Sequence, residues 1–248
     1  MHRPLPGARP GHTPAHYGFG VPVRSRVSRT LTALLSGRLL AGPRVEDAVR
    51  VAGELISDGR RVALEHLPGP ADDAAAEFAA LIGEIHAAGL AADCELTLPP
   101  EHLGLAGAAA AAGLAVASPA DLPGATAIVR ADDVDAESRC RRLVSQRVRL
   151  AEGRGNGADL AFVRCLNVLM AGDGHPEIAA SDKRLIAIAG ERAAWNGRTP
   201  DSWEHVMPYG VLSDEQHRLV AGGYVVRVAV PSGSGAAASL VRHLGGRA

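Results

Sequence analysis

Apolar residues along this chain recur with two alternating periods, one typical of helices and one typical of strands. A helical stripe precedes Gly59, the residue type that most often ends a helix, and consists of Val45, Ala48, Val49, Ala52 and Ile56. The segment that follows, RVALEHL (61–67), is short and mostly apolar, which predicts a strand. The same alternation of helix and strand continues to the end of the chain.

Eight strands are expected, at 61–67, 94–98, 114–118, 126–130, 148–152, 177–181, 203–207 and 224–230. Helical patterns lie between most of them and after the last, at 78–85, 103–112, 136–144, 159–170, 183–194, 213–221 and 235–244. Parallel strands need long crossovers, which helices supply. Eight such units favour an α/β fold, a closed (β/α)8 TIM-like barrel, over an open sheet.

One connection is too short for this pattern. Only seven residues, PADLPGA (119–125), separate the third and fourth expected strands. A helical crossover normally takes about a dozen residues or more. Either the helix is missing at this point or one of the two flanking segments is not a barrel strand, so the barrel is expected to be incomplete here.

The N-terminal part of the chain differs in composition from the rest. Residues 1–23 are rich in Pro, Gly and His and lack apolar periodicity, so they are expected to form a disordered leader. An apolar and basic stretch at 27–40 is helix-like and predicts an N-terminal helical segment before the first strand. Residues 24–248 are therefore expected to form a single barrel domain.

Composition limits the classes of partner. Aromatic residues make up only 3% of the chain and apolar residues 47%, so the core must consist mainly of Ala, Val, Leu and Ile. The net charge of −1 gives no bulk attraction to nucleic acid, and we expect no nucleic-acid partner. No apolar run is long enough to span a membrane and no secretory signal is recognisable. A cytoplasmic protein is the expectation.

Cysteine and acidic residues give no clear metal site. Cys94, Cys140 and Cys165 are widely spaced and odd in number, which indicates buried apolar thiols rather than a disulfide framework or a zinc site. The pair Asp132–Asp133 follows a strand and could bind a divalent ion together with Glu137. An acidic cluster at a helix N-terminus is the simpler interpretation, and no metal is expected.

Six blocks of sequence carry a resemblance to a known family, and they are SGRLLAGPRVEDAVRVAGELISDGRRVALEHL (36–67), AIVRADDVDAESRCRRL (127–143), RVRLAEG (147–153), AFVRCLNVLMAGDGHPEIAASD (161–182), WEHVMPYGV (203–211) and RVAVPSGSGAAASLVRHL (227–244). In this order and at this spacing they resemble bacterial proline dehydrogenases. The resemblance implies a barrel with FAD at its C-terminal mouth. It also implies an amino-acid ligand, L-proline or an analogue, that is oxidised to 1-pyrroline-5-carboxylate.

Four residues are expected to contact the cofactor. By resemblance, Arg149 matches an arginine that contacts the flavin, and Arg130 stands where the family has a flavin-contacting glutamine. Gly233 and Gly235 lie between a strand and a helix, where backbone amides could hold a phosphate or form an ordinary turn. His66 ends the first strand and is either a ligand-facing group or a solvated strand end.

Two residues are expected to be catalytic. Arg242 matches the first of two arginines that clamp the substrate carboxylate in the family, and His243 stands in place of the second. An arginine fork suits a carboxylate because it donates two parallel hydrogen bonds. A histidine is shorter and is neutral for much of the time near neutral pH, so the clamp is expected to be weakened.

Other positions depart from the family pattern. Glu95 stands where the family has a lysine, and the only lysine of the chain is Lys183. The loop at 153–159 is much shorter than in the family, and further differences fall at Ala180, Ser181 and Ala229. Two hypotheses follow: an active FAD-dependent proline dehydrogenase, or a pseudoenzyme that serves as a binding or assembly module with an unknown protein partner. A third is a barrel for another amino acid or a phosphorylated ligand.

Overall fold

Eight parallel strands form a closed barrel in residues 38–245, the part of the chain that the computed structural model describes, with side chains described up to residue 240. Every strand pairs with the next in sequence, and the last pairs with the first. The strands are β1 (Arg61–His66), β2 (Cys94–Thr97), β3 (Ala115–Ser118), β4 (Thr126–Arg130), β5 (Arg147–Ala151), β6 (His175–Ala179), β7 (Glu204–Pro208) and β8 (Val226–Ser232). The predicted strands and the (β/α)8 fold are confirmed, although β6 lies two residues earlier and β8 two residues later than expected.

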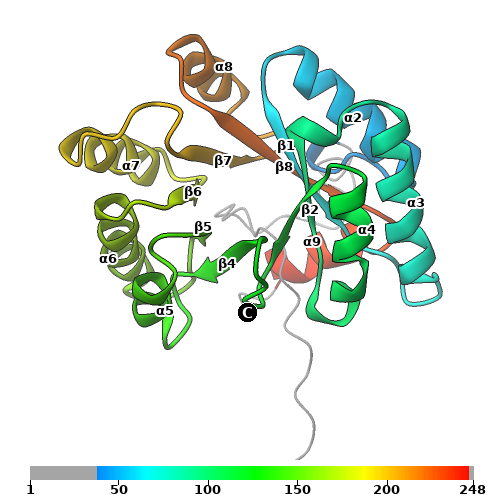
Figure 1. Cartoon of the computed structure of the whole chain (residues 1–248), viewed down its shortest axis with the longest axis horizontal. Coiled ribbons are helices and arrows are strands. Elements are labelled where there is room, and N and C mark those ends of the chain that lie inside the picture. Colours follow the sequence, from blue (N-terminus) through cyan, green and yellow to red (C-terminus); the bar gives the residue numbers. More distant parts are fainter. Residues whose placement is uncertain (1–37, 246–248) are drawn as a thin grey trace, which may run out of the picture.

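Helices surround the strands (Figure 1). They are α2 (Val45–Ser57), α3 (Ala74–Ala87), α4 (Ala106–Ala111), α5 (Ala136–Arg142), α6 (Ala158–Ala171), α7 (Lys183–Trp195), α8 (Ser213–Ala221) and α9 (Ala236–Gly245), with short 3-10 turns at Ala91–Asp93 and Pro100–Leu105. The predicted leader at 1–23 and nearly all of the helical segment at 27–40 lie outside the described residues. Within residues 38–245, every helix is too short or too polar to cross a membrane.

Strand residues alternate between two cores because successive side chains of a strand point to opposite faces. In β1, Val62 and Leu64 pack outward in the large apolar layer beneath the helices, whereas Ala63 between them does not belong to that layer. Small aliphatic residues dominate this outer layer, as the low aromatic content predicted. Trp203, Phe78 and Phe162 are its largest fully buried side chains.

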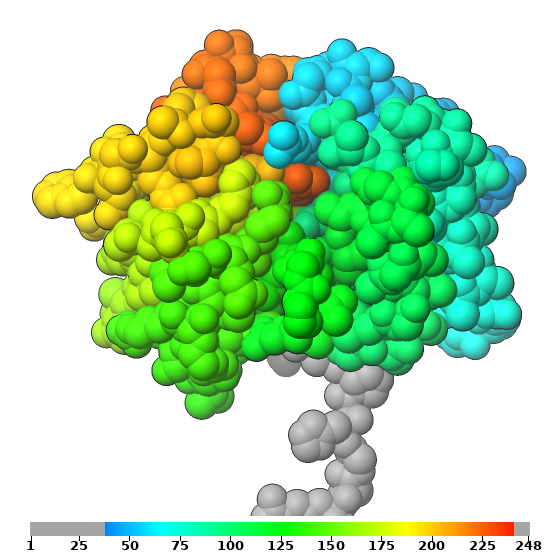
Figure 2. All heavy atoms as spheres, viewed as in Figure 1, coloured from blue at the N-terminus to red at the C-terminus, as the bar shows by residue number. Residues whose placement is uncertain are grey.

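The seam between the ends of the chain is closed by β1 and β8, which pair over six positions from Arg61↔Arg227 to His66↔Ser232. Figure 2 shows the corresponding surface, where α2 in blue lies beside α8 in orange. Arg60, just after α2, is buried and donates a 3.0 Å hydrogen bond to Gln216 of α8. A side-chain bond therefore joins the two ends of the described chain outside the sheet as well.

The connection at 119–125 lacks a helix, yet both flanking segments are barrel strands. The pairing register explains how so few residues suffice. Ala117 pairs with Thr126 and Ser118 with Ala127, so β4 begins beside the end of β3 and the chain need not return along a whole strand. The barrel is thus incomplete only in its outer helical layer, and the expected gap does not reach the sheet.

Candidate functional site

Arg149 lies in the interior of the barrel. Its side chain is fully buried, and its guanidinium bonds Glu177 on the neighbouring β6 and Glu95 on β2, three strands away. Side chains of β5 and β2 can meet in this way only across the inside of a closed barrel. The nitrogen-to-oxygen distance from Arg149 Nη2 to Glu177 Oε2 is 2.6 Å. Glu95, the residue expected by resemblance in place of a lysine, is a direct partner of Arg149.

A second arginine completes the interior ion pairs. Arg227 of β8 is 2.8 Å from Glu204 of β7 and 4.0 Å from Glu177. We call these five buried residues the interior network: Glu95, Arg149, Glu177, Glu204 and Arg227. Three carboxylates and two guanidiniums give it a formal charge of −1. Arg61 and Arg147, which are partly exposed at the starts of their strands, contact Glu204 at 2.7 and 3.1 Å and offset that charge.

The arginines of the interior network keep Glu177 and Glu204 ionised. Burial by itself raises the pKa of Glu177, but Arg149, Arg227 and Arg147 outweigh it and hold that pKa below its usual value. Burial also opposes ionisation of Glu204, and a hydrogen bond with His175 together with Arg227 and Arg61 holds its pKa well below the usual range. Glu177 and Glu204 therefore act in the network as charged partners of the arginines and not as neutral acids.

Arg149 is separated from the C-terminal mouth by an apolar layer. On β5, β6, β7 and β8, the inward-facing residue two positions after the charged one is small or aliphatic. These four residues form a separate buried cluster, made of Ala151, Ala179, Val206 and Ala229. Ala151 follows Arg149 by two positions on β5, which places it one interior level closer to the mouth. The guanidinium thus lies below this layer rather than at the strand ends.

The interior network is paired in charge but not saturated in hydrogen bonds. Nη1 of Arg149, Oε1 of Glu95 and Oγ1 of Thr97 are buried and make no hydrogen bond with the protein. Such groups are uncommon in folded proteins and cost stability. The close pairing of the opposite charges around these atoms is expected to offset this loss of stability.

Arg130 ends β4 at the mouth of the barrel, and its charge is already paired. Its Nη2 atom is 3.0 Å from both carboxylate oxygens of Asp132, and its side chain is 20% exposed. Asp132 also accepts a hydrogen bond from the backbone of Arg154, in the short connection between β5 and α6. This pair ties the end of β4 to the next connection along the rim.

The glycines at the end of β8 allow close backbone packing. Gly233 has φ +96°, and a Cβ there would overlap the backbone of Leu67, as one on Gly235 would overlap that of Pro68. The amide of Gly233 donates to the carbonyl of Gly42, and the amide of Gly235 donates to that of Leu67. Both predicted phosphate-binding amides therefore have backbone partners.

His66 is neither ligand-facing nor solvated. It lies on the outer face of β1 and is buried, with Nδ1 3.0 Å from Oγ of Ser232 and Nε2 2.7 Å from a carboxylate oxygen of Glu77. These hydrogen bonds join β1, β8 and α3 at the mouth end. The expectation for this residue was wrong because the strand end is covered by α3, whose Phe78 packs edge-on against the imidazole.

The predicted carboxylate clamp consists of two residues near the end of the chain. Arg242 and His243 belong to α9, but their side chains lie outside the described residues. Their catalytic role stays a prediction. Among the described residues, no cluster of three or more His, Cys, Asp or Glu side chains could hold a metal ion.

Residues of the barrel can be tested against the flavin that the resemblance implies. A flavin that receives a hydride needs donors and positive charge beside its ring. Arg149 is neutralised by two carboxylates below an apolar layer, and Arg130 is paired with Asp132. The described residues at these positions do not fit a flavin, so FAD is indicated by the resemblance alone.

Three members of the interior network were missed in the sequence: Glu177, Glu204 and Arg227. Each is a charged residue inside an otherwise apolar strand, in HPEIA, EHVMP and VRVAVPS. A charge at an inward position of a buried strand needs a partner, and that is the signal that could have found them. Their partners lie on other strands and are not visible from local sequence.

Solved structures with a similar fold include several proteins called proline utilization A (PutA). The PutA of Bdellovibrio bacteriovorus, inactivated by N-propargylglycine, has a TM-score of 0.77 and 13% identity and is matched over 87% of this chain. A PutA mutant from Bradyrhizobium japonicum has a TM-score of 0.65 and 18% identity over 85%. A PutA structure with proline bound in remote sites has a TM-score of 0.63 and 17% identity over 84%.

This chain spans about a third of those proteins, between 30% and 33% of their lengths. No protein-family model and no curated protein matches it. Identities this low show the fold alone. The resemblance to proline dehydrogenases that the sequence blocks indicated is confirmed at that level.

Proposed function

We propose that this chain is a divergent proline dehydrogenase-like barrel that has lost flavin-dependent oxidation of L-proline and acts as a binding or assembly module. The observation that carries the proposal is the position of Arg149, which is fully buried and paired with Glu95 and Glu177. A partner protein or an amino-acid ligand, L-proline or an analogue, would be the bound molecule. A cytoplasmic location is part of the proposal.

Electrostatics supports this proposal over the enzyme. Hydride transfer to a flavin builds negative charge on the ring, and protein cations near the ring stabilise it. Glu95 brings a carboxylate into the barrel and neutralises the arginine that the resemblance assigned to this task. Losing several groups that act together is seldom compensated by the ones that remain.

An active FAD-dependent proline dehydrogenase is the second candidate. The likeness of fold to the PutA of Bdellovibrio bacteriovorus, with a TM-score of 0.77, favours it. Arg242 lies on α9, which follows the strand that closes the barrel, and an arginine there could bind a carboxylate. The two candidates differ in whether electrons leave L-proline.

A turnover assay decides between them. The purified full chain is incubated with FAD, L-proline and a reducible dye, with a PutA protein as positive control. We expect no proline-dependent dye reduction. Proline-dependent reduction that requires FAD and disappears in an Arg242→Ala variant would show an active enzyme and refute the proposal.

A binding assay tests the second part of the proposal, that the chain keeps a binding function. Ligands that bind the folded state alone raise the melting temperature in proportion to the logarithm of their concentration. A rise with L-proline, without turnover, would identify an amino-acid-binding module. If L-proline has no effect, the proposal requires a protein partner, and a chain that neither binds L-proline nor associates with a protein from its own cells would contradict it.

A further inference from the structure

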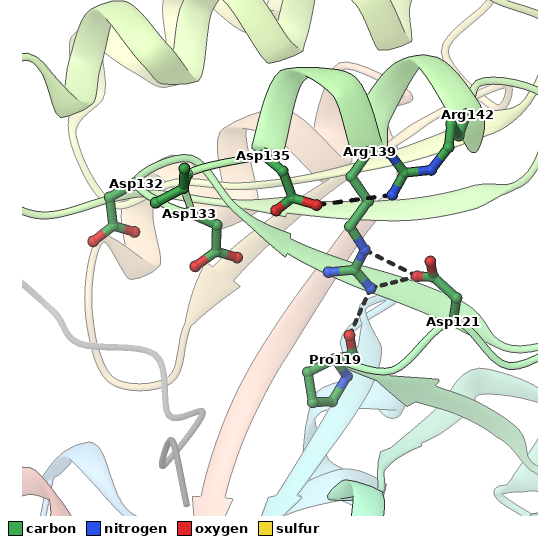
Figure 3. A pocket seen from close by; sticks show the side chains of 8 residues that line it. Pro119, Asp121, Asp132, Asp133, Asp135, Arg139 and Arg142 are labelled. Carbon is green, nitrogen blue, oxygen red and sulfur yellow. Dashed lines mark hydrogen bonds and ion pairs between the residues drawn. The ribbon is translucent and has the colours of Figure 1, made fainter. Parts of the chain in front are cut away.

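An open hollow lies beside the C-terminal end of β4, next to the connection that lacks a helix (Figure 3). Its volume is about 540 Å³, within the range of ligand-binding clefts. We call it the rim hollow, and its lining includes six charged residues: Asp121, Asp132, Asp133, Asp135, Arg139 and Arg142. Four carboxylates against two guanidiniums give these residues a formal charge of −2, so the rim hollow attracts cations.

Ion pairs already hold both guanidiniums of the rim hollow. Arg139 pairs with Asp121 at 2.5 Å, and Arg142 lies 3.8 Å from Asp135. Asp133 differs from the other carboxylates, because no basic side chain lies within 4 Å of it in the part of the chain that the structure describes. It accepts a 3.3 Å hydrogen bond from the backbone of the last β4 residue. This carboxylate can therefore bind an arginine from elsewhere without displacing one from the barrel.

Val134 adds an apolar contact to the rim hollow. It stands between Asp133 and Asp135 in the loop before α5, and its side chain is fully exposed. A single exposed apolar residue is ordinary on a protein surface. Here it lies among carboxylates, so one surface offers an anionic and an apolar contact together. A segment that carries arginines and aliphatic side chains matches both.

Charge is divided unevenly along the chain. Residues 1–37 contain five arginines and no acidic residue. Residues 38–248 hold all 27 acidic side chains against 21 of the 26 basic ones, which gives them a net charge of −6. The near-neutral total therefore combines a basic N-terminal segment with an acidic barrel, and opposite charges on one chain attract each other.

The described chain begins at the same end of the barrel as the rim hollow. The amide of Ala41 donates to the carbonyl of Pro231, so the chain enters beside the C-terminal part of β8. The carbonyl of Arg38 lies against Gly210, in the turn after β7. In a closed ring of eight strands, β4 lies opposite β8. The entry point and the rim hollow are thus on opposite sides of one mouth.

The residues before Arg38 are long enough to cross that mouth. The stretch at 27–40 is predicted to be helical, and its 14 residues would span about 21 Å. Three residues before it, in extended form, would add about 10 Å. The total of about 30 Å is close to the diameter of a small domain. Three arginines then fall at the far end of the segment, on the side of β4, and they are Arg24, Arg26 and Arg29.

We propose that the rim hollow is the docking surface for residues 24–37 of the same chain. Arginines of 24–29 pair with Asp133 and the neighbouring carboxylates, since a guanidinium can donate two parallel hydrogen bonds to one carboxylate. The aliphatic residues that follow contact Val134. Docking places the segment over the C-terminal mouth, where ligands reach barrels of this fold. The inference does not rest on the proposed function, because it requires neither FAD nor L-proline.

Paramagnetic relaxation in the full chain tests this docking. All three native cysteines are buried, so a cysteine introduced by Ser25→Cys is the thiol that a nitroxide spin label reaches. We expect the amide signals of 120–122 and 132–135 to lose about half of their intensity or more at low salt, and to regain it in about 1 M NaCl, where the Debye length is only about 3 Å. Full intensity of these signals in the labelled chain at low salt would overturn the inference, whatever the variants below do.

Variants and a mixing experiment identify the contact. Asp133→Asn should reduce the broadening several-fold, whereas Glu191→Gln, an exposed acidic change on α7, should leave it unchanged. Unchanged broadening in Asp133→Asn would overturn the assignment of that carboxylate. Spin-labelled chains are also mixed with unlabelled, ¹⁵N-enriched chains. Broadening in the mixture as strong as within one chain would show that a second copy supplies the segment, and would overturn docking to its own barrel.

Discussion

Arg149 shares its charge between Glu95 and Glu177, and all three side chains are buried. Replacing the guanidinium with an apolar side chain would leave two buried carboxylates without their cationic partner. We predict that Arg149→Met lowers the free energy of unfolding by about 3–5 kcal/mol, the usual cost of breaking a buried pair. Urea unfolding followed by circular dichroism measures this loss.

Arg141 supplies the matched control for that prediction. It pairs with Glu137 on the surface of α5, and its side chain is 61% exposed. Arg141→Met should change stability by no more than about 0.5 kcal/mol. If both methionine variants lose similar small amounts, the interior network is not the buried ion-pair set described above.

His205 predicts a pH dependence of its own. It is buried on β7, its ring centroid lies 4.3 Å from that of Trp203, and burial lowers its pKa to about 4. The unfolded chain, with an ordinary histidine pKa of about 6.5, binds a proton more readily. The stabilisation is therefore complete above about pH 6.5 and is lost as the pH falls toward 4, by on the order of 3 kcal/mol in all.

Urea titrations at a series of pH values test this dependence. His205→Asn should flatten the fall in stability between about pH 7 and about pH 5, since the asparagine at this buried position does not titrate. His217→Asn, an exposed change on α8, should keep the wild-type slope. A wild-type slope in His205→Asn would mean that the burial of this imidazole does not govern the transition.

At the scale of elements, the turn between β8 and α9 requires a glycine for its backbone conformation as well as for its close packing. Gly233 has φ +96°, and a Cβ there would meet the backbone of Leu67. We predict that Gly233→Ala costs at least about 2 kcal/mol, because strain and overlap act together. Differential scanning calorimetry or urea unfolding provides the measurement.

Gly190 offers the opposite case within α7. Nothing lies within 4 Å of a Cβ added there, so Gly190→Ala should raise stability by about 0.5–1 kcal/mol through helix propensity.

A Gly233→Ala protein as stable as wild type would show that the turn can relax. The close backbone packing at the mouth would then not constrain this part of the barrel.

The elements themselves were largely predictable from sequence because their apolar periods are regular and glycines mark many of their ends. All eight strands appear where expected, within about two residues. The short connection at 119–125 was recognised as anomalous. How seven residues can join the two strands is explained by the register Ala117↔Thr126, which arises from pairing between strands. Local sequence carries no information on such a stagger.

The candidate site was less predictable for a related reason. Arg149 and Arg130 were singled out in the sequence as charged strand residues. The pairing of Arg149 with Glu95 depends on the geometry inside the closed barrel, and that of Arg130 with Asp132 depends on the turn after β4. Partners across a closed barrel become visible only when the sheet has been closed.

At the scale of the whole molecule, we propose that a proline dehydrogenase-like barrel has replaced a cofactor-facing positive charge with an internally neutralised network. The most direct test is a titration of the purified full chain with FAD, followed by flavin fluorescence and by equilibrium dialysis. We predict no saturable binding and a protein that remains colourless after the free flavin is removed. Stoichiometric retention of FAD, with a flavin absorbance band that L-proline bleaches, would contradict the account.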